Sequence, residues 1–235
     1  MVISIKKQSF QRKSALIAGT SLLIMALAAF FSYGFAHGSL VVQGDASATF
    51  HNIKSSNLLF KAEILGWVII LITDIVVAWA FYVFLKSINK NLSLLGAWFH
   101  LTYVTILGIA ILNLIFVLFL TQSTDYLSSF KTDQLQAQML LFLEAFECMW
   151  SIGLIIFGGH LMIVGYLVFK SHKIPKIISA LLLLASIGYI VINVLNTIFS
   201  QYDVLISILE IGFNIPMILG ELGFGIWLLF RGGKV

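Results

Sequence analysis

The stretch LFKAEILGWVIILITDIVVAWAFYVFL, residues 59–85, decides the fold of this chain. It contains only three charged residues, Lys61, Glu63 and Asp74. The hydrocarbon core of a bilayer is about 30 Å thick, and a helix needs about 20 mostly apolar residues to cross it. Because lipid offers the backbone no hydrogen-bond partners, an apolar stretch of this length crosses a membrane as a helix.

Five further stretches have the same character. Over the whole chain 60% of the residues are hydrophobic and 10% are charged, whereas about a quarter of the residues of a soluble domain are charged. The sequence therefore predicts an all-α polytopic membrane protein, a single domain over residues 1–235 built as a bundle of six transmembrane helices. The predicted spans are residues 14–36, 59–85, 92–120, 139–169, 177–199 and 209–230.

The longest predicted connection, residues 37–58, contains a helix signal. The pair Gly44-Asp45 is typical of a turn followed by an N-cap, because an Asp side chain accepts hydrogen bonds from the free N–H groups of a first helical turn. The residues that follow place Phe50 and Ile53 on one side. This pattern predicts a short helix at the outer membrane interface, or an ordered loop packed on the bundle.

The basic residues predict the orientation of the chain. Eleven Lys and Arg residues lie in the termini and in the connections on the same side of the membrane, and three lie on the other side. Lys and Arg are enriched in cytoplasmic segments, so both termini are predicted to be cytoplasmic. The net charge of +4 then reflects membrane topology and anionic lipid headgroups, and no nucleic-acid partner is predicted.

Cysteine count and motifs limit the chemistry. The single cysteine, Cys148, excludes an intramolecular disulfide and a cysteine-based metal cluster. The chain contains no Walker A, HExxH or GxSxG motif. The sequence assigns no metal, cofactor or oligomeric state.

Three segments resemble a known family. They are residues 12–18 followed by GSLVVQGDA at 38–46, the segment 74–93, and FGGHL at 157–161 followed by motifs that end with Gly188-Tyr189. Together they resemble the bacterial multi-pass membrane family catalogued as domain of unknown function 4386, over nearly the whole chain. The resemblance implies six helices in a bacterial inner membrane, and it implies no established activity.

Acidic residues inside the predicted spans are the main candidates for a site, because charges in hydrocarbon are costly and are usually functional. Glu63, Trp67 and Asp74 share a helix face, and Glu210, Asn214 and Glu221 share another, by their spacing. We expect a ligand-binding site in one interior cavity that opens outward. Its predicted residues are Asp74, Glu144, Glu147 and Glu221, with Asn113, Asn193 and Asn196 as neutral partners.

The charge of such a cavity needs compensation. Few basic residues are predicted at the depth of these carboxyl groups, and the histidines are predicted to lie deeper. We therefore expect a proton, a metal ion or an organic ammonium to neutralise them. The alternative is that protonated carboxyl groups only form hydrogen bonds between helices, at about 0.6 kcal/mol each.

Two histidines form a second group of candidates. His100 and His160 are predicted at matching depths in the cytoplasmic half of the membrane. A membrane histidine most often forms a hydrogen bond between helices, although a facing pair is also able to bind a metal or haem. We consider a proton-handling role for both residues, linking the acidic cavity to the cytoplasm.

The leading functional hypothesis is that the protein binds or transports a cation or a cationic small molecule. One alternative is an intramembrane enzyme acting on a lipid or isoprenoid, with Glu144 and Glu147 as acid and base or as ligands of a divalent metal. Another is a non-catalytic sensor or immunity-type partner of other membrane proteins.

Overall fold

The structure is a computed structural model that describes residues 2–122 and 125–234, and these residues form helices with short connections and no strand. In chain order the helices are α1 (Val2–Ala29), η1 (Phe30–His37), α2 (Gly38–Leu40), α3 (Ala46–Ser55), α4 (Asn57–Leu85), α5 (Lys90–Thr121), η2 (Asp125–Ser129), α6 (Thr132–Lys170), α7 (Lys176–Ile198), η3 (Ser200–Tyr202) and α8 (Asp203–Phe230).

Within the described residues, six helices are long and apolar enough to cross a membrane. This confirms the prediction of an all-α protein with six membrane-spanning helices. The first of them extends over Phe10–Leu40, beyond the predicted end at residue 36. It continues because η1 is a π-helix and α2 follows it without a break, so His37 lies in a helix and not in a loop.

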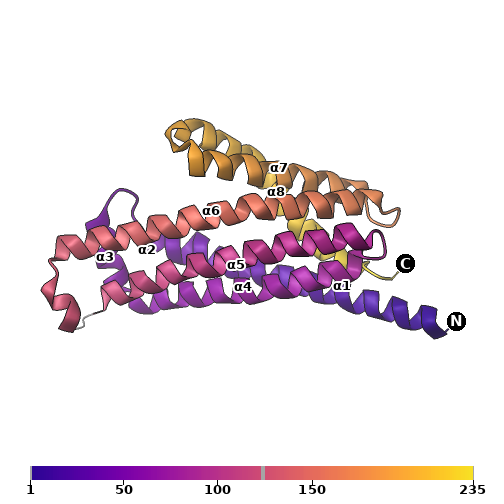
Figure 1. Ribbon diagram of the computed structural model, residues 1–235, viewed down its shortest axis with the longest axis horizontal. Helices are drawn as coiled ribbons and strands as arrows, with labels where there is room; N and C mark the ends of the chain where they lie inside the picture. Colours follow the sequence, from indigo (N-terminus) through magenta and orange to yellow (C-terminus); the bar gives the residue numbers. More distant parts are fainter. Residues whose placement is uncertain (1, 123–124, 235) are drawn as a thin grey trace.

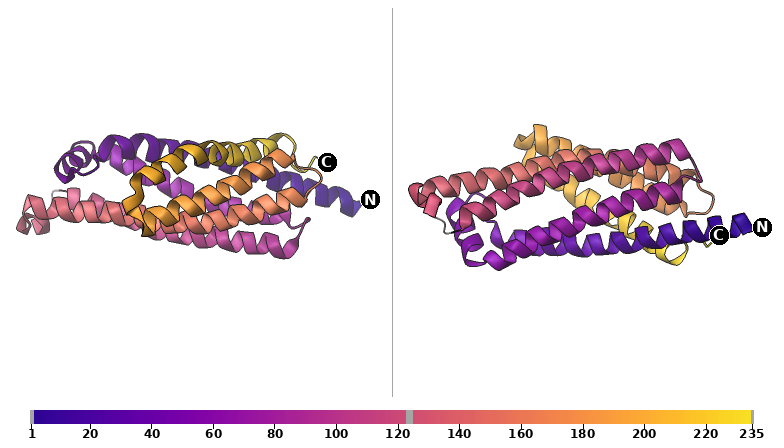
Figure 2. Two further views of the ribbon diagram at one scale, coloured as in Figure 1. Left: turned by 90° about the horizontal axis from the view of Figure 1, so that it is seen from above. Right: turned by 60° about the horizontal axis from the view of Figure 1, so that its bottom comes forward.

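The long helices lie roughly along one axis, and both termini lie at the same end of the bundle (Figures 1 and 2). We call this end, with the connections at residues 86–89 and 171–175, the basic end. Helix α4 packs between α1 and α5, and α6 packs between α5 and α7. The hairpin of α7 and α8 leans away from α6 toward the opposite end (Figure 1).

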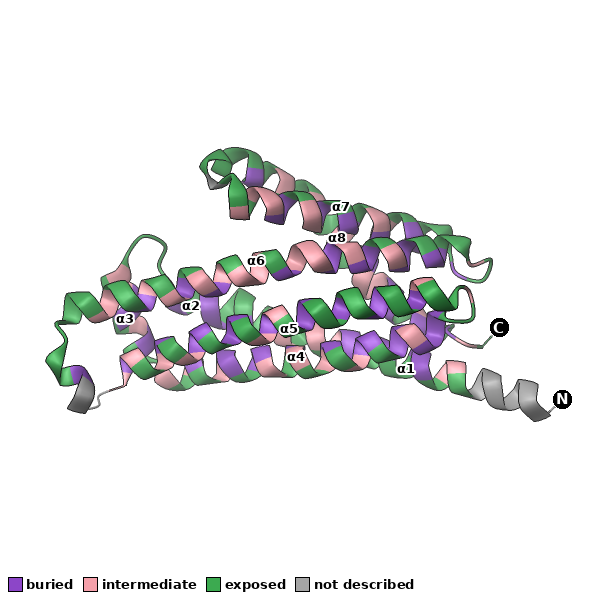
Figure 3. Cartoon of the chain, in the orientation of Figure 1, coloured by how far each residue is buried: buried purple, intermediate pink, exposed green. Residues whose placement is uncertain are grey.

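Glycines set the closest helix contacts. A Cβ atom on Gly19 of α1 would lie 2.7 Å from the carbonyl oxygen of Gly225 in α8, and one on Gly158 of α6 would lie 3.0 Å from that of Ser186 in α7. Small residues of this kind let membrane helices approach closely. Buried residues face the bundle interior, while the outer faces are exposed, as lipid-facing surfaces require (Figure 3).

Two helix ends are fixed by polar contacts. Gly44 has a positive φ of 76°, and the Asp45 side chain accepts a 2.8 Å hydrogen bond from the N–H of Ala48. The predicted turn, N-cap and short helix before α4 are therefore confirmed. At the basic end the Arg12 guanidinium donates hydrogen bonds to the carbonyls of Leu228 (3.0 Å) and Gly232 (2.8 Å), which joins α1 to the end of α8.

Candidate functional site

A cavity of about 710 Å³ lies between α1, η1, α4, α5, α6, α7 and α8. This volume is within the range of about 300–1,000 Å³ that is typical of sites for small organic ligands. Its polar and aromatic lining residues are Phe30, Tyr33, Trp67, Asp74, Tyr103, Glu147, Trp150, Ser151, Phe157, Tyr189, Asn193, Asn196, Glu210, Asn214 and Glu221.

The cavity is acidic. Among the residues that the structure describes, the lining contains the carboxyl groups of Asp74, Glu147, Glu210 and Glu221, and it contains no Lys, Arg or His. The second oxygen of Asp74, Oδ2, is buried and has no hydrogen-bond partner in the described part of the chain. A buried polar atom without a partner is unfavourable, so this oxygen keeps a hydrogen-bonding capacity that no described residue satisfies.

Aromatic rings form one wall beside these carboxyl groups. The ring centroid of Trp150 lies 4.9 Å from that of Tyr33 and 4.9 Å from that of Trp67, and both pairs meet edge to face. The π-helix η1 supplies Tyr33, and π-helical turns are frequent at functional sites. The faces of Tyr and Trp rings attract cations.

A chain of hydrogen bonds extends from Asp74 into the bundle. Asp74 Oδ1 lies 2.9 Å from His100 Nε2, His100 Nδ1 lies 3.1 Å from His160 Nε2, and His160 Nδ1 lies 2.8 Å from the carbonyl oxygen of Gly96. All three side chains are about 1% exposed. We call these residues the Asp74–His100–His160 relay.

The proton positions in the relay follow from its last acceptor. The Gly96 carbonyl only accepts, so His160 Nδ1 carries a proton, and a neutral His160 accepts at Nε2. His100 must then donate from Nδ1. The remaining proton lies between His100 Nε2 and Asp74, so the pair is either a neutral imidazole with a carboxylic acid or an imidazolium with a carboxylate. In both forms the pair has no net charge.

A third histidine, His37, lies beside the cavity wall. His37 Nδ1 is 2.7 Å from Glu63 Oε1, and His37 Nε2 is 3.4 Å from Oε1 of the lining residue Glu147. Glu63 is fully buried. The expectation that the histidines lie deeper than the cavity carboxyl groups is therefore wrong for Asp74 and Glu147, because His100 and His37 of neighbouring helices reach them.

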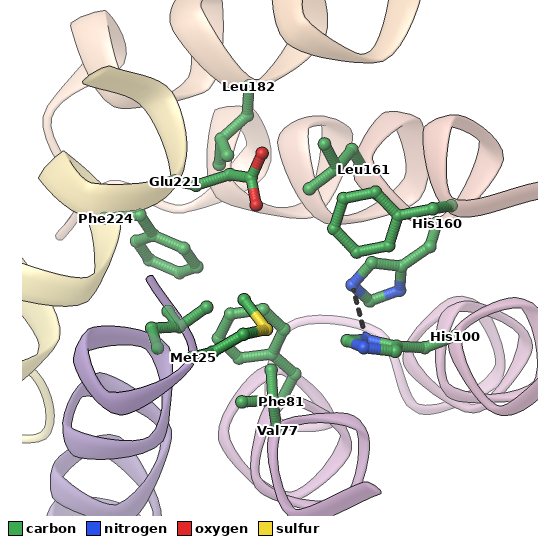
Figure 4. Close-up of a pocket in the computed structure, with 11 residues that line it drawn as sticks. Met25, Val77, Phe81, His100, His160, Leu161, Leu182, Glu221 and Phe224 are labelled. Atoms are coloured by element: carbon green, nitrogen blue, oxygen red, sulfur yellow. Dashed lines mark hydrogen bonds between the residues drawn. The ribbon is translucent and has the colours of Figure 1, made fainter. Parts of the chain in front are cut away.

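A much smaller cavity, of about 10 Å³, lies next to the main one toward the basic end. Its wall includes Glu221 of α8 and the imidazoles of His100 and His160, and Figure 4 shows these groups on facing sides of it. The space is about that of one water molecule. Glu221 itself accepts a 2.8 Å hydrogen bond from the Tyr189 hydroxyl.

Five of the seven predicted ligand-binding residues line the main cavity: Asp74, Glu147, Glu221, Asn193 and Asn196. Glu144 does not, since it is exposed and lies about 60° around α6 from Glu147. Asn113 does not either, because its amide donates hydrogen bonds to the Ala110 carbonyl (3.1 Å) and to Met149 Sδ (3.3 Å).

Several lining residues were not among the predicted site residues. Glu210 and Asn214 are signalled by the face that they share with Glu221. The aromatic residues Tyr33 and Trp150 carry no such signal, because their roles depend on which helices are neighbours.

The chain belongs to the family described as Domain of unknown function (DUF4386), which matches residues 17–232. This confirms the family resemblance of the sequence motifs. The chain is also similar to an uncharacterized protein of Archaeoglobus fulgidus, with 33% identity over 173 residues, 74% of this chain and 85% of the relative. The comparison with solved structures found no match.

The relay makes a prediction about stability. His100→Ala removes one partner of a buried pair, which typically costs about 3–5 kcal/mol, so the melting temperature of the purified protein should fall by many degrees. His172→Ala, in the exposed connection at residues 171–175, is the control and should change little. Asp74→Asn disturbs the same contact. The loss in free energy of unfolding for the double variant, His100→Ala with Asp74→Asn, should therefore be smaller than the sum of the losses for the two single variants. Additive losses would contradict the coupling between the two residues.

Proposed function

We propose that this protein binds a small organic cation in the main cavity and transports it across the membrane. The observation that supports this most is the lining itself. Four carboxyl groups and a wall of aromatic rings face one space of about 710 Å³, and among the described residues no basic side chain lines it.

The physical reason is charge compensation. A carboxylate in hydrocarbon is costly unless a proton, a partner or a ligand neutralises it. An ammonium group placed between carboxylates and the rings of Tyr33 and Trp150 gains Coulomb attraction and about 0.5–2 kcal/mol from each well-placed ring. The unpartnered Asp74 Oδ2 is one acceptor for its N–H or C–H groups.

An organic cation fits this cavity better than a metal ion. The described residues contain no group of three or more His, Cys, Asp and Glu residues that could hold a metal. A quaternary or primary ammonium is recognised by dispersed carboxylates and aromatic faces and needs no tight ligand shell. This favours cation binding over the alternative of metal-dependent chemistry on a lipid.

His100 and His160 have a proton-handling role in this proposal. A cation at Asp74 stabilises the carboxylate form and drives the shared proton onto His100. His160 and the small neighbouring cavity then provide a path along which the proton moves toward the basic end. Binding of one cation is thereby linked to the movement of one proton.

The proposed location is the cytoplasmic membrane of a bacterium, with both termini inside. The excess of Lys and Arg at the basic end supports this orientation. The main cavity then opens toward the outer half of the membrane, because Glu210 and Asn196 line it near the ends of α8 and α7 that are far from the termini.

Tetramethylammonium tests the cation site. It should raise the melting temperature of the detergent-purified protein, with a stabilisation of about 2.7 kcal/mol at a hundredfold excess over Kd. Asp74→Asn and Glu221→Gln should abolish the shift. Glu144→Gln removes an exposed carboxyl group of α6 outside the cavity and should retain the shift; an equal loss in all three variants would exclude this site.

The pH dependence of the same shift tests the proton-handling role. Because the proton and the cation compete for Asp74, the apparent affinity for tetramethylammonium should rise about tenfold for each unit increase in pH while one proton is released. The slope counts released protons and does not depend on their path, so His160→Gln should keep it. The variant should instead slow the proton release that follows mixing with tetramethylammonium, followed with a pH indicator, and an unchanged rate would remove His160 from the role.

The orientation is tested by labelling. In a Cys148→Ser background, Lys54→Cys on α3 should react with a membrane-impermeant maleimide in intact cells. Lys173→Cys at the basic end should react only after the membrane is permeabilised. Reversed labelling would place the termini outside.

A further inference from the structure

Helices α1 and α8 touch only over part of their length in the contacts that the described residues show. Near the basic end, Arg12 binds carbonyls of α8, Gly19 lies against Gly225 and Leu229, and Leu22 also lies against Gly225. Toward the opposite end the hairpin of α7 and α8 leans away from the rest of the bundle (Figures 1 and 2).

The main cavity reaches the lipid-facing surface where these two helices separate. Phe30 of η1 and Ile218 of α8 both line the cavity, and they are 76% and 55% exposed. A residue that lines a cavity and is also exposed lies at its edge. Both residues belong to membrane-spanning helices, so this edge opens sideways into the bilayer.

The lining combines the acidic and aromatic groups with an apolar strip. The strip comes from several helices and includes Met25, Ala26, Ala29, Ile70, Leu154 and Leu222. Along α8 the cavity extends from Glu210 to Glu221, eleven residues apart, or about 16 Å at 1.5 Å per residue. This length fits an extended alkyl chain as well as a charged head.

We propose that the ligand is a cationic amphiphile, an ammonium group on an alkyl chain, that enters from the bilayer between α1 and α8. The inference rests on the proposed cation site and adds its substrate class. The ammonium group lies between Asp74 and Glu221, and the chain lies along the apolar strip toward the opening at Phe30 and Ile218.

The charge of the lining selects among amphiphiles. A zwitterionic lipid carries a phosphate next to its ammonium group, and no basic side chain among the described residues lines the cavity to accept that phosphate. Like charges at close range are repelled in a site of low dielectric constant. The ligand therefore carries a net positive charge, and phosphatidylethanolamine and phosphatidylcholine are poor ligands.

Alkyltrimethylammonium ions of increasing chain length test this inference on the full chain in phosphatidylcholine nanodiscs. Binding is followed by the fluorescence of Trp67 and Trp150, which line the cavity, and affinity is referred to the free aqueous concentration. Each added methylene should increase the affinity about three- to fourfold, since burying a CH₂ group contributes about 0.8 kcal/mol. Tetramethylammonium gives the affinity of the head alone.

A matched pair of variants on α1 locates the chain. Ala29→Phe fills part of the apolar strip and should remove most of the chain-length gain while tetramethylammonium still binds. Leu27→Phe adds the same ring at a residue that is 72% exposed and does not line the cavity, and it should behave as the unmodified protein does. Retained binding of tetramethylammonium shows that each variant is folded.

The outcomes separate the two proposals. If tetramethylammonium binds and the affinity does not rise with chain length, or if Ala29→Phe keeps the gain, the amphiphile inference is overturned and the cation site stands. If neither the short nor the long ions bind, both proposals fail. If phosphatidylethanolamine in the nanodiscs blocks the binding of decyltrimethylammonium, the ten-carbon member of the series, the occupant is a membrane lipid and the requirement for net positive charge is wrong.

Discussion

A carboxyl group in the hydrocarbon region of a membrane must be neutralised, and this constraint organises the interior of the bundle. Two carboxyl groups have close histidine partners: His100 meets Asp74 at 2.9 Å and His37 meets Glu63 at 2.7 Å. Two other carboxyl groups, which line the cavity with Asp74, have weaker partners. Glu221 accepts one hydrogen bond from a neutral tyrosine, and Glu147 lies 3.4 Å from His37. The protein therefore compensates Glu221 and Glu147 only in part, and a ligand in the cavity is able to supply the rest.

The position of α8 follows from the forces that pack membrane helices. No hydrophobic effect drives two apolar helices together in lipid, so close contact requires small residues or polar bonds. Helix α8 has both near the basic end, at Gly225 and at the carbonyls that Arg12 binds. Between Asp203 and Leu219 its faces are mostly exposed, and its polar residues Glu210 and Asn214 face the cavity. The separation of α8 from α1 is thus consistent with its own sequence.

The sequence predicts what depends on local order along one chain segment. Apolar length predicts the six long helices, Gly44-Asp45 predicts the start of α3, and helical periodicity places Glu210, Asn214 and Glu221 on one face. The sequence does not predict the π-helix, because the amino-acid composition of residues 30–37 does not reveal that the backbone hydrogen bonds shift by one residue. It also does not predict that His100 reaches Asp74, since this depends on α4, α5 and α6 being neighbours. Glu144 lies outside the cavity for a local reason, the 60° that separate it from Glu147 around α6.

The two oxygens of Asp74 connect proton and ligand in the proposed function. Oδ1 holds the hydrogen bond to His100, and Oδ2 has no partner among the described residues. With the shared proton on Asp74 the carboxyl group is neutral and attracts a cation weakly. With the proton on His100 the carboxylate attracts the cation, but the imidazolium repels it across a few ångströms of low-dielectric interior. The lowest free energy with a cation bound is therefore reached when the proton leaves the pair altogether. The contact from His100 to His160 provides its path, so proton release and cation binding follow from the same geometry.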